Sequence, residues 1–291
     1  MPRRYDTVSF LSDLGTRDES VGVVKAVLAD LAPHVRVLDL THEIPPFDTR
    51  AGSLALARAV PYVPSGVVLA VVDPGVGTSR RALAIEVAGG EGVFVGPDNG
   101  LLAPAIAMAG GAERCVVLSN EAFHLPSPSA TCAARDVFAP AAAHLCSGVD
   151  LAELGDAVDA DELLPGVVPL PRDEGDTLVC EVLWVDRFGN CQLNVGPDDI
   201  AHLGARVRVL AGDPAGPSGP VVRVAARVRT YADVGVGAVG LVDDASGMVS
   251  LVLDRRAASE ELAIDTGSQV VLAPLGDDAG GVTSPVQFRP R

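Results

Sequence analysis

A carboxylate and an arginine follow an apolar run in the stretch VVDPGVGTSRRAL, which extends from Val71 to Leu83. Water is a poor nucleophile because its pKa is about 15.7, so a base or a positive charge that stabilises developing hydroxide speeds its attack. Asp73 could accept the proton, and Arg80 could orient that carboxylate and stabilise the anion. The pair therefore predicts a site that activates water, whereas the adjacent Arg81 is predicted to be a surface charge.

Polar residues also follow the two earlier strand patterns. Asp13 follows the first strand pattern, Thr41 and His42 follow the second, and Asp73 follows the third. Because ligands bind at the carboxyl ends of strands in open α/β sheets, these side chains are the first candidates for a binding site. Converging carboxylates there would suit a polyol or a cation. The alternative for each residue is a structural role as the cap of a helix or turn.

The glycines beside Asp73 do not form a nucleotide-phosphate loop. Arg80 stands where the dinucleotide fingerprint needs its third glycine, and no GK[ST] motif occurs. No pair of histidines has the spacing of metal ligands, and the thiols are not grouped. We therefore expect no cofactor and no metal. His124 lies in FHLPSPS without a nucleophile pattern, so it is predicted to be a solvated loop histidine.

Composition narrows the class of protein. A chain of 291 residues that is 48% hydrophobic predicts two domains. The net charge of -16 disfavours nucleic acid as a partner, because phosphate backbones are repelled. No apolar stretch approaches the roughly 20 residues that span a bilayer, so no membrane contact is expected. Five scattered cysteines without CxxC, and first residues without the apolar run of a signal peptide, predict a cytoplasmic location.

The first part of the chain has an alternating pattern of strands and helices, which predicts an α/β domain over residues 1–167 with a Rossmann-like layered sheet. The predicted strands are 6–11, 35–40, 67–72, 82–87, 92–95 and 115–118. The predicted helices are 19–31, 50–60, one that begins near 101, and 136–146.

The pattern changes after the α/β region. PGVVPLPRDEGD is rich in proline and charge and predicts a linker at 168–177. Short alternating strands then predict a smaller all-β barrel over 178–291. Its predicted strands are 178–185, 191–195, 206–210, 221–229, 249–253 and 270–272.

Six blocks carry a family resemblance that spans both predicted domains. Taken in order, SDLGTRDES, DLTHEIPPFD, VVDPGVGTSRR, VGPDNGLL, TCAARDVFAP and VDRFGN resemble the S-adenosylmethionine hydroxide adenosyltransferases, whose relatives are the fluorinases and chlorinases. The resemblance implies an α/β domain, a β-barrel domain, and a homotrimer with active sites at subunit interfaces. It also implies that water attacks C5′ of S-adenosylmethionine, which gives adenosine and methionine without a cofactor.

The resemblance further implies substrate-binding roles for particular residues. In the first domain, Asp13 would hold the ribose hydroxyls, Ser20 would meet the methionine end, and Thr131 would join the substrate-binding set. The implied residues of the second domain are Asp186 for the methionine ammonium, Phe188 and Tyr231 for the faces of adenine, Asn190 for its edge, Ser246 for the methionine carboxylate and Arg255 for a backbone contact to adenine.

The residue at position 73 separates water from halide as the attacking group. Two like charges about 4 Å apart repel by several kcal/mol at an effective dielectric of about 20, so a halide site does not tolerate a close carboxylate. In the halogenating relatives the equivalent residue is uncharged, typically tyrosine. Asp73 therefore favours hydroxide, and a halogenase is the alternative.

The block TCAARD departs from the family. The hydrolases read close to TFHGRD there, and their histidine, which completes an Asp-Arg-His set, is replaced by Ala133. Loss of one general base costs about 10²- to 10⁴-fold in rate. Three interpretations follow: slow hydrolysis by Asp73 and Arg80, replacement of the histidine by another residue or water, or a protein that binds S-adenosylmethionine or adenosine without turnover. Cys132 could be a new nucleophile, but a buried inert thiol is favoured.

Overall fold

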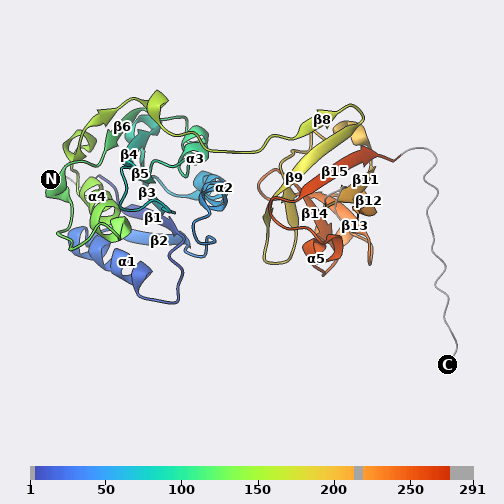
Figure 1. Ribbon diagram of the computed structural model, residues 1–291, viewed down its shortest axis with the longest axis horizontal. Helices are drawn as coiled ribbons and strands as arrows, with labels where there is room; N and C mark the ends of the chain where they lie inside the picture. The colour runs from blue at the N-terminus through green and yellow to red at the C-terminus, as the bar shows by residue number, and fades with distance from the viewer. Residues whose placement is uncertain (1–3, 213–218, 276–291) are drawn as a thin grey trace. The chain divides into compact units, whose positions relative to one another are not determined.

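The computed structural model describes residues 4–212 and 219–275 (Figure 1). Contacts between residues divide the chain into two compact units, Met1–Val168 and Pro169–Arg291. Each unit has its own buried apolar core. The predicted combination of an α/β domain and a β-barrel domain is confirmed.

The first unit is built on a seven-stranded sheet with the order β2-β1-β3-β5-β4-β6-β7. Strands β2, β1, β3 and β5 are parallel, and β4 is antiparallel to both β5 and β6. The strands are β1 (Thr7–Ser12), β2 (Arg36–Thr41), β3 (Gly66–Val71), β4 (Ala82–Val87), β5 (Gly92–Pro97), β6 (Arg114–Val117) and β7 (Ala157–Val158). Strand β3 is central and every one of its residues is buried, which explains why its sequence is an unbroken apolar run.

Helices cover both faces of this sheet (Figure 1). Helix α1 (Ser20–Leu31) packs against α4 (Ala139–Cys146), and α2 (Thr49–Ala59) packs against α3 (Ala103–Met108). Successive side chains of β1 point to opposite faces, so Phe10 joins the core under α1 and α4 while Leu11 joins the core under α2. No helix within residues 4–212 and 219–275 is long and apolar enough to cross a membrane.

The helix predicted from residue 136 begins later, because a π-helical turn, η4 (Ala134–Phe138), precedes α4. Pro140 has no N–H, so the carbonyl of Asp136 lacks its usual helical donor. The backbone N–H of Leu125 donates to that carbonyl instead, at 2.9 Å. This bond holds the backbone of Leu125 against the turn η4 that precedes α4.

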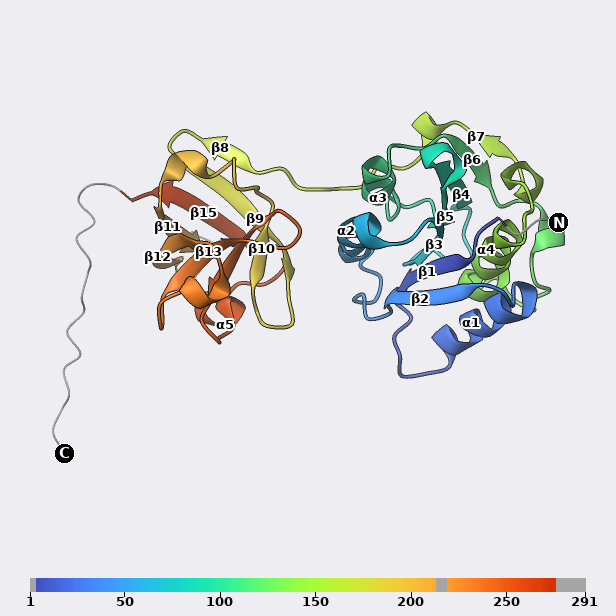
Figure 2. The same ribbon diagram turned by 180° about the vertical axis from the view of Figure 1, so that it is seen from behind.

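The second unit is a closed barrel of seven strands in the order β10-β14-β13-β12-β11-β15-β9, and pairing of β9 with β10 closes it. Figure 2 shows β9 and β10 side by side. The strands are β9 (Thr177–Val185), β10 (Cys191–Leu193), β11 (Arg206–Ala211), β12 (Val221–Val228), β13 (Val239–Asp243), β14 (Val249–Leu253) and β15 (Gln269–Pro274). A short strand, β8 (Arg172–Glu174), lies within the predicted linker and pairs with β9.

Strand β13 was absent from the sequence prediction. Glycine is depleted in strands, and Gly240 interrupts this one. The structure explains why glycine occupies this position, because a Cβ at Gly240 would lie only 2.8 Å from Cγ2 of Val234. The parallel pairing of β12 with β13 is a further feature that alternation alone does not indicate. The short helix α5 (Ala258–Leu262) was also not predicted.

Candidate active site

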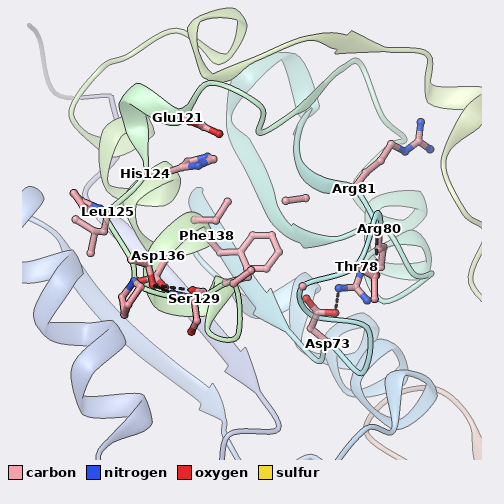
Figure 3. Close-up of a pocket in the computed structure, with 18 residues that line it drawn as sticks. Asp73, Thr78, Arg80, Arg81, Glu121, His124, Leu125, Ser129, Asp136 and Phe138 are labelled. Carbon is pink, nitrogen blue, oxygen red and sulfur yellow. Dashed lines mark hydrogen bonds and ion pairs between the residues drawn. The ribbon is translucent and has the colours of Figure 1, made fainter.

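Asp73 and Arg80 form an ion pair in the loop that joins β3 to β4 (Figure 3). Tight turns shape this loop, since the N–H of Val76 donates to the carbonyl of Asp73 at 3.2 Å. A Cβ at Gly75 would collide with the guanidinium of Arg80, so glycine permits the close approach. The side chains of Asp73 and Arg80 are only 7% and 16% exposed. The pair is therefore largely shielded from solvent.

The environment of Asp73 suits a base. Burial is the largest influence and raises the pKa of its carboxyl above the ordinary value of 3.8. The charge of Arg80 and a hydrogen bond from the Gly75 backbone lower the pKa but do not cancel the effect of burial. The negative charge of Asp13 raises it further, which reflects the adjacency of β1 and β3. Asp73 therefore holds a proton more readily than an exposed aspartate does.

A cavity of about 610 Å³ opens beside this pair (Figure 3). One water molecule needs about 30 Å³, so the cavity has room for a larger molecule as well as a water. Ala133 lies on the cavity wall, where its small side chain leaves space. Thr131 lies next to the wall, and its Oγ1 is 2.9 Å from Oγ of the lining residue Ser129. Cys132 is half-buried and is not a lining residue of this cavity.

Asp13 follows β1 and is held by an unusual neighbour. Its Oδ2 accepts a hydrogen bond of 2.9 Å from the backbone N–H of Phe47. Phe47 has φ of 69° and a side chain that is 72% exposed. A bulky residue in this backbone region is strained, and strain of this kind clusters at functional sites. Sequence reasoning missed Phe47, because its bond to Asp13 joins residues 34 positions apart and neither this bond nor its positive φ leaves a local pattern.

The polar residues that follow β2 have structural roles. Oγ of Ser12 lies 2.8 Å from Nδ1 of His42, and Nε2 of His42 lies 3.2 Å from Oδ1 of Asp39. Ser12 is fully buried, so this Ser-His-Asp set has no access to a substrate. It fixes the end of β1 directly before Asp13. Thr41 accepts a hydrogen bond from the N–H of Glu43 at 3.1 Å, which is the predicted turn-capping alternative.

Ser20 is the first residue of α1, and its N–H donates to Oδ1 of Asp18 at 2.9 Å. It is half-buried and does not line the cavity of Asp73. The structure therefore places Ser20 at a helix N-terminus and does not bring it to the wall that Asp73 and Arg80 share.

Two other residues of this unit have surroundings that the sequence does not indicate, and the prediction that Arg81 is a surface charge is wrong. Arg81 is not a free surface charge, because its Nε donates to the buried Asp98 at 2.8 Å and its Nη2 donates to the carbonyl of Glu162 at 2.6 Å. It fastens the segment near Glu162 to the sheet. His124 does lie in a loop, but it is half-buried and lines the cavity of Asp73. The bond between Leu125 and Asp136 places it there, and no local pattern reveals that bond.

In the barrel, most of the predicted residues line one cavity of about 500 Å³. They are Asp186, Phe188, Asn190, Tyr231 and Arg255. Phe188 is 77% exposed and Tyr231 is 49% exposed. Exposed aromatic faces at a cavity are typical of sites that stack a flat ligand.

The loop between β9 and β10 is organised by Asp186. Its Oδ1 accepts from the backbone N–H groups of Phe188 and Asn190 at 2.8 and 2.9 Å, and its Oδ2 accepts from Nδ2 of Asn190 at 2.8 Å. The Asn190 amide thus uses one of its two N–H donors within the loop, and its Oδ1 remains as an acceptor. Gly189 turns the chain at φ of 79°, where a Cβ would collide with Ala257.

The structure does not bring Ser246 to the wall of the barrel cavity. Its N–H donates to Oδ1 of Asp244 at 2.8 Å in the turn between β13 and β14. Asp244 also accepts from Gln192 at 2.7 Å and from Ser250 at 2.9 Å, so it organises this turn. Arg255 does line the cavity, and its φ of 53° gives its backbone an uncommon orientation there.

The chain thus combines two units. The α/β unit carries a buried pair of a carboxylate and a guanidinium beside a cavity, and the β-barrel unit carries exposed aromatic faces at a second cavity. Family models agree: residues 8–155 match the S-adenosylmethionine hydroxide adenosyltransferase N-terminal domain, and residues 180–271 match the C-terminal domain. The chain belongs to this family.

Individual relatives have the same organisation. A Salinispora tropica protein named (R)-S-adenosyl-L-methionine hydrolase is 42% identical over 90% of this chain and 96% of its own length. A crystal structure of an uncharacterized conserved protein from Thermotoga maritima is 32% identical, with a TM-score of 0.82 over 91% of this chain and 99% of that chain. A fluorinase from an Actinoplanes species is more distant, at 29% identity over 68% of this chain and 74% of its own length.

Proposed function

We propose that this chain hydrolyses S-adenosylmethionine to adenosine and methionine by attack of water at C5′. The observation that carries the proposal is the shielded pair of Asp73 and Arg80 beside a cavity, in a chain 42% identical to a protein named for this hydrolysis. A carboxylate at this position opposes a bare halide, because their like charges repel.

The chemistry needs little from the protein beyond placement. A bond forms between the water oxygen and C5′ while the bond between C5′ and sulfur breaks, and the sulfonium sulfur takes the electron pair. The sulfonium is already a good leaving group, so no acid is required. The site must hold water in line with the breaking bond and exclude other solvent. The reaction is redox-neutral, so the proposal includes neither a cofactor nor a metal.

Asp73 and Arg80 have different roles in the activation of the water molecule. Asp73 accepts the proton, which its raised pKa favours. Arg80 holds the carboxylate in place and stabilises the negative charge that develops on the attacking oxygen. The burial of both side chains strengthens these effects, because the local dielectric is low.

The nucleoside is held by residues from both units in this proposal. Asp13 binds the ribose hydroxyls with the oxygen that Phe47 does not use, and Phe47 adds an aromatic wall. Phe188 and Tyr231 pack against adenine, and the free Oδ1 of Asn190 accepts from its amino group. The remaining assignments follow the family resemblance: Ser20, Thr131, Asp186 and Ser246 for the methionine part and Arg255 for a backbone contact to adenine.

The proposed assembly is a homotrimer in the cytoplasm, with active sites at subunit interfaces. Each of the two cavities carries only part of the set needed for S-adenosylmethionine, which supports shared sites. Mixed trimers test this. Subunits with Asp73→Asn and subunits with Phe188→Ala, each inactive alone, should regain part of the activity when they are unfolded and refolded together, and failure to do so would oppose shared sites.

Product analysis tests the activity. The purified chain is incubated separately with the R and S epimers at sulfur of S-adenosylmethionine, and the nucleosides are separated by chromatography. We expect adenosine and methionine in equal amounts, with preference for the R epimer that the Salinispora relative's name specifies. No adenosine from either epimer after hours at high enzyme concentration would refute hydrolysis.

A second candidate is a protein that binds S-adenosylmethionine or adenosine without turnover. The small side chain of Ala133 on the cavity wall favours it, since a smaller side chain leaves room but supplies no base. Calorimetry would then show tight binding, and the ligand would be recovered unchanged.

A further inference from the structure

His124 lies on the cavity wall across from Asp73 and Arg80 (Figure 3). It follows the short helix η3 (Glu121–Phe123), and the ring of Phe123 contacts the ring of His144 on α4 with centroids 5.0 Å apart. On its other side, the N–H of Leu125 is bonded to Asp136. Contacts on both sides therefore fix the backbone from which the imidazole enters the cavity.

The other ionisable groups that face this cavity differ from His124 in their bonding. Asp136 is buried, which raises the pKa of its carboxyl, but hydrogen bonds from Arg135 and Ser127 outweigh burial and leave the pKa lowered. Both of its oxygens accept from Arg135, at 2.6 and 2.8 Å. Asp136 therefore stays charged and is a poor proton acceptor.

The remaining ionisable groups on the cavity wall are either bonded to another side chain or exposed to solvent. Arg81 is bonded to Asp98, and Arg80 is bonded to Asp73. Glu121 lines the cavity and is exposed to solvent. Within residues 4–212 and 219–275, the imidazole of His124 has no hydrogen-bond or ion-pair partner, so its ring nitrogens are available for hydrogen bonds with water in the cavity.

Hydrolysis of a sulfonium leaves one proton to remove. The water oxygen bonds to C5′ and the sulfonium sulfur takes the electron pair of the broken bond, so the positive charge on sulfur disappears. One of the two protons of the attacking water stays on the new 5′-hydroxyl group, and the other leaves as H⁺ in each turnover. Asp73 takes that proton first, but its side chain is 7% exposed and must lose the proton before the next turnover. A partly exposed imidazole in the same cavity provides a path from the buried carboxyl to solvent.

We propose that His124 is a proton-relay residue that carries the proton of the attacking water, through water in the cavity, from Asp73 to solvent. This inference rests on the proposed hydrolysis. His124 does not touch the reacting atoms in this account; it is a positioning and relay residue that acts through water. His124 lines the same cavity as Ala133. Among the described residues it is the one histidine that lines this cavity.

The test is chemical rescue of His124→Ala. We expect kcat to fall about 10- to 100-fold, which is no more than the smallest effect of removing a direct acid or base, with KM for S-adenosylmethionine unchanged. Added imidazole should restore kcat in a saturable way, and the restoration should follow the concentration of neutral imidazole as pH is varied. A structural role for His124 would give neither result.

Two further variants complete the test. His202→Ala removes an exposed histidine of the barrel and should leave kcat unchanged. Ala133→His in the His124→Ala background returns an imidazole to the same wall and should recover at least part of the loss. Unchanged kcat in His124→Ala, or a loss that neither imidazole nor Ala133→His relieves, would overturn the relay. An unmodified chain that forms no adenosine would instead refute the proposed hydrolysis, and the relay with it.

Discussion

The backbone N–H of Phe47 donates to Oδ2 of Asp13 at 2.9 Å, and this bond joins the ends of two segments that follow neighbouring strands. It orients the carboxylate that we assign to the ribose and holds an exposed aromatic ring beside it. Both consequences can be measured.

Phe47→Ala should raise KM for S-adenosylmethionine about tenfold with little change in the free energy of unfolding. The ring is 72% exposed, so its removal should alter stability by no more than about 0.5 kcal/mol. Steady-state kinetics and urea denaturation provide the two numbers. Tyr62→Ala is the matched control, since Tyr62 is 79% exposed and, unlike Phe47, has no hydrogen bond to Asp13. Equal KM values for the two variants would remove Phe47 from the binding site.

Asn190 should select adenine over hypoxanthine. One N–H of its Nδ2 is bonded to Asp186, which fixes the orientation of the side-chain amide. In the proposed site its Oδ1 faces the amino group of adenine and would oppose the carbonyl oxygen of an inosyl substrate. Sites of this kind discriminate strongly, because the wrong ligand leaves buried polar groups unpaired. We expect kcat/KM for S-adenosylmethionine to exceed that for its inosyl analogue by about 100-fold. Asn190→Ala should reduce this ratio to near one; an unchanged ratio would contradict the assignment.

The neighbouring arginines should differ in what they contribute. Arg80→Ala removes the partner of Asp73 and should lower kcat about 100-fold, as the loss of one charge-stabilising donor does. Arg81→Ala removes the ion-pair partner of the buried Asp98 and should lower the free energy of unfolding by about 2 kcal/mol with kcat retained. This loss is smaller than for a fully buried pair, because Arg81 is partly exposed and Asp98 keeps a hydrogen bond from the N–H of Leu164. Kinetics and urea denaturation of both variants check this pattern, and the reversed pattern would refute it.

The raised pKa of Asp73 has a defined effect on stability. A carboxyl whose pKa is higher in the folded chain favours folding while protonated. Its stabilising contribution is present below the unfolded pKa and is lost as pH rises through the folded pKa, which lies above 3.8. Relative to the unmodified chain, Asp73→Asn should therefore gain stability as pH rises from about 3 to 7. Urea denaturation across this range measures the difference, and a trend of opposite sign would show a lowered pKa.

The sequence predicted those site residues whose positions follow from strand periodicity. The apolar run before Asp73 and the alternation before Asp13 locate two strand ends, and the two strands are neighbours in the sheet. In the barrel, the block VDRFGN indicates a turn whose members stay together because Asp186 bonds to its own loop.

Other features depend on contacts between distant residues. The burial of His124 follows from a bond between Leu125 and Asp136, which exists because Pro140 leaves a carbonyl free. Phe47 has a positive φ and is bonded to Asp13, which lies 34 positions earlier in the sequence. Arg81 is bonded to Asp98, which lies 17 positions later. Strand β13 was missed because the need for Gly240 arises from the side chains packed around it. Local propensity carries none of this information.

The identity of the attacking group is the central claim, and isotope labelling tests it most directly. The chain is incubated with S-adenosylmethionine in H₂¹⁸O that contains chloride and fluoride, and the nucleoside products are analysed by mass spectrometry. The account predicts adenosine with one ¹⁸O atom in its 5′-hydroxyl group and no halogenated nucleoside. A 5′-halogenated nucleoside, or adenosine without the label, would contradict activation of water by Asp73 and Arg80.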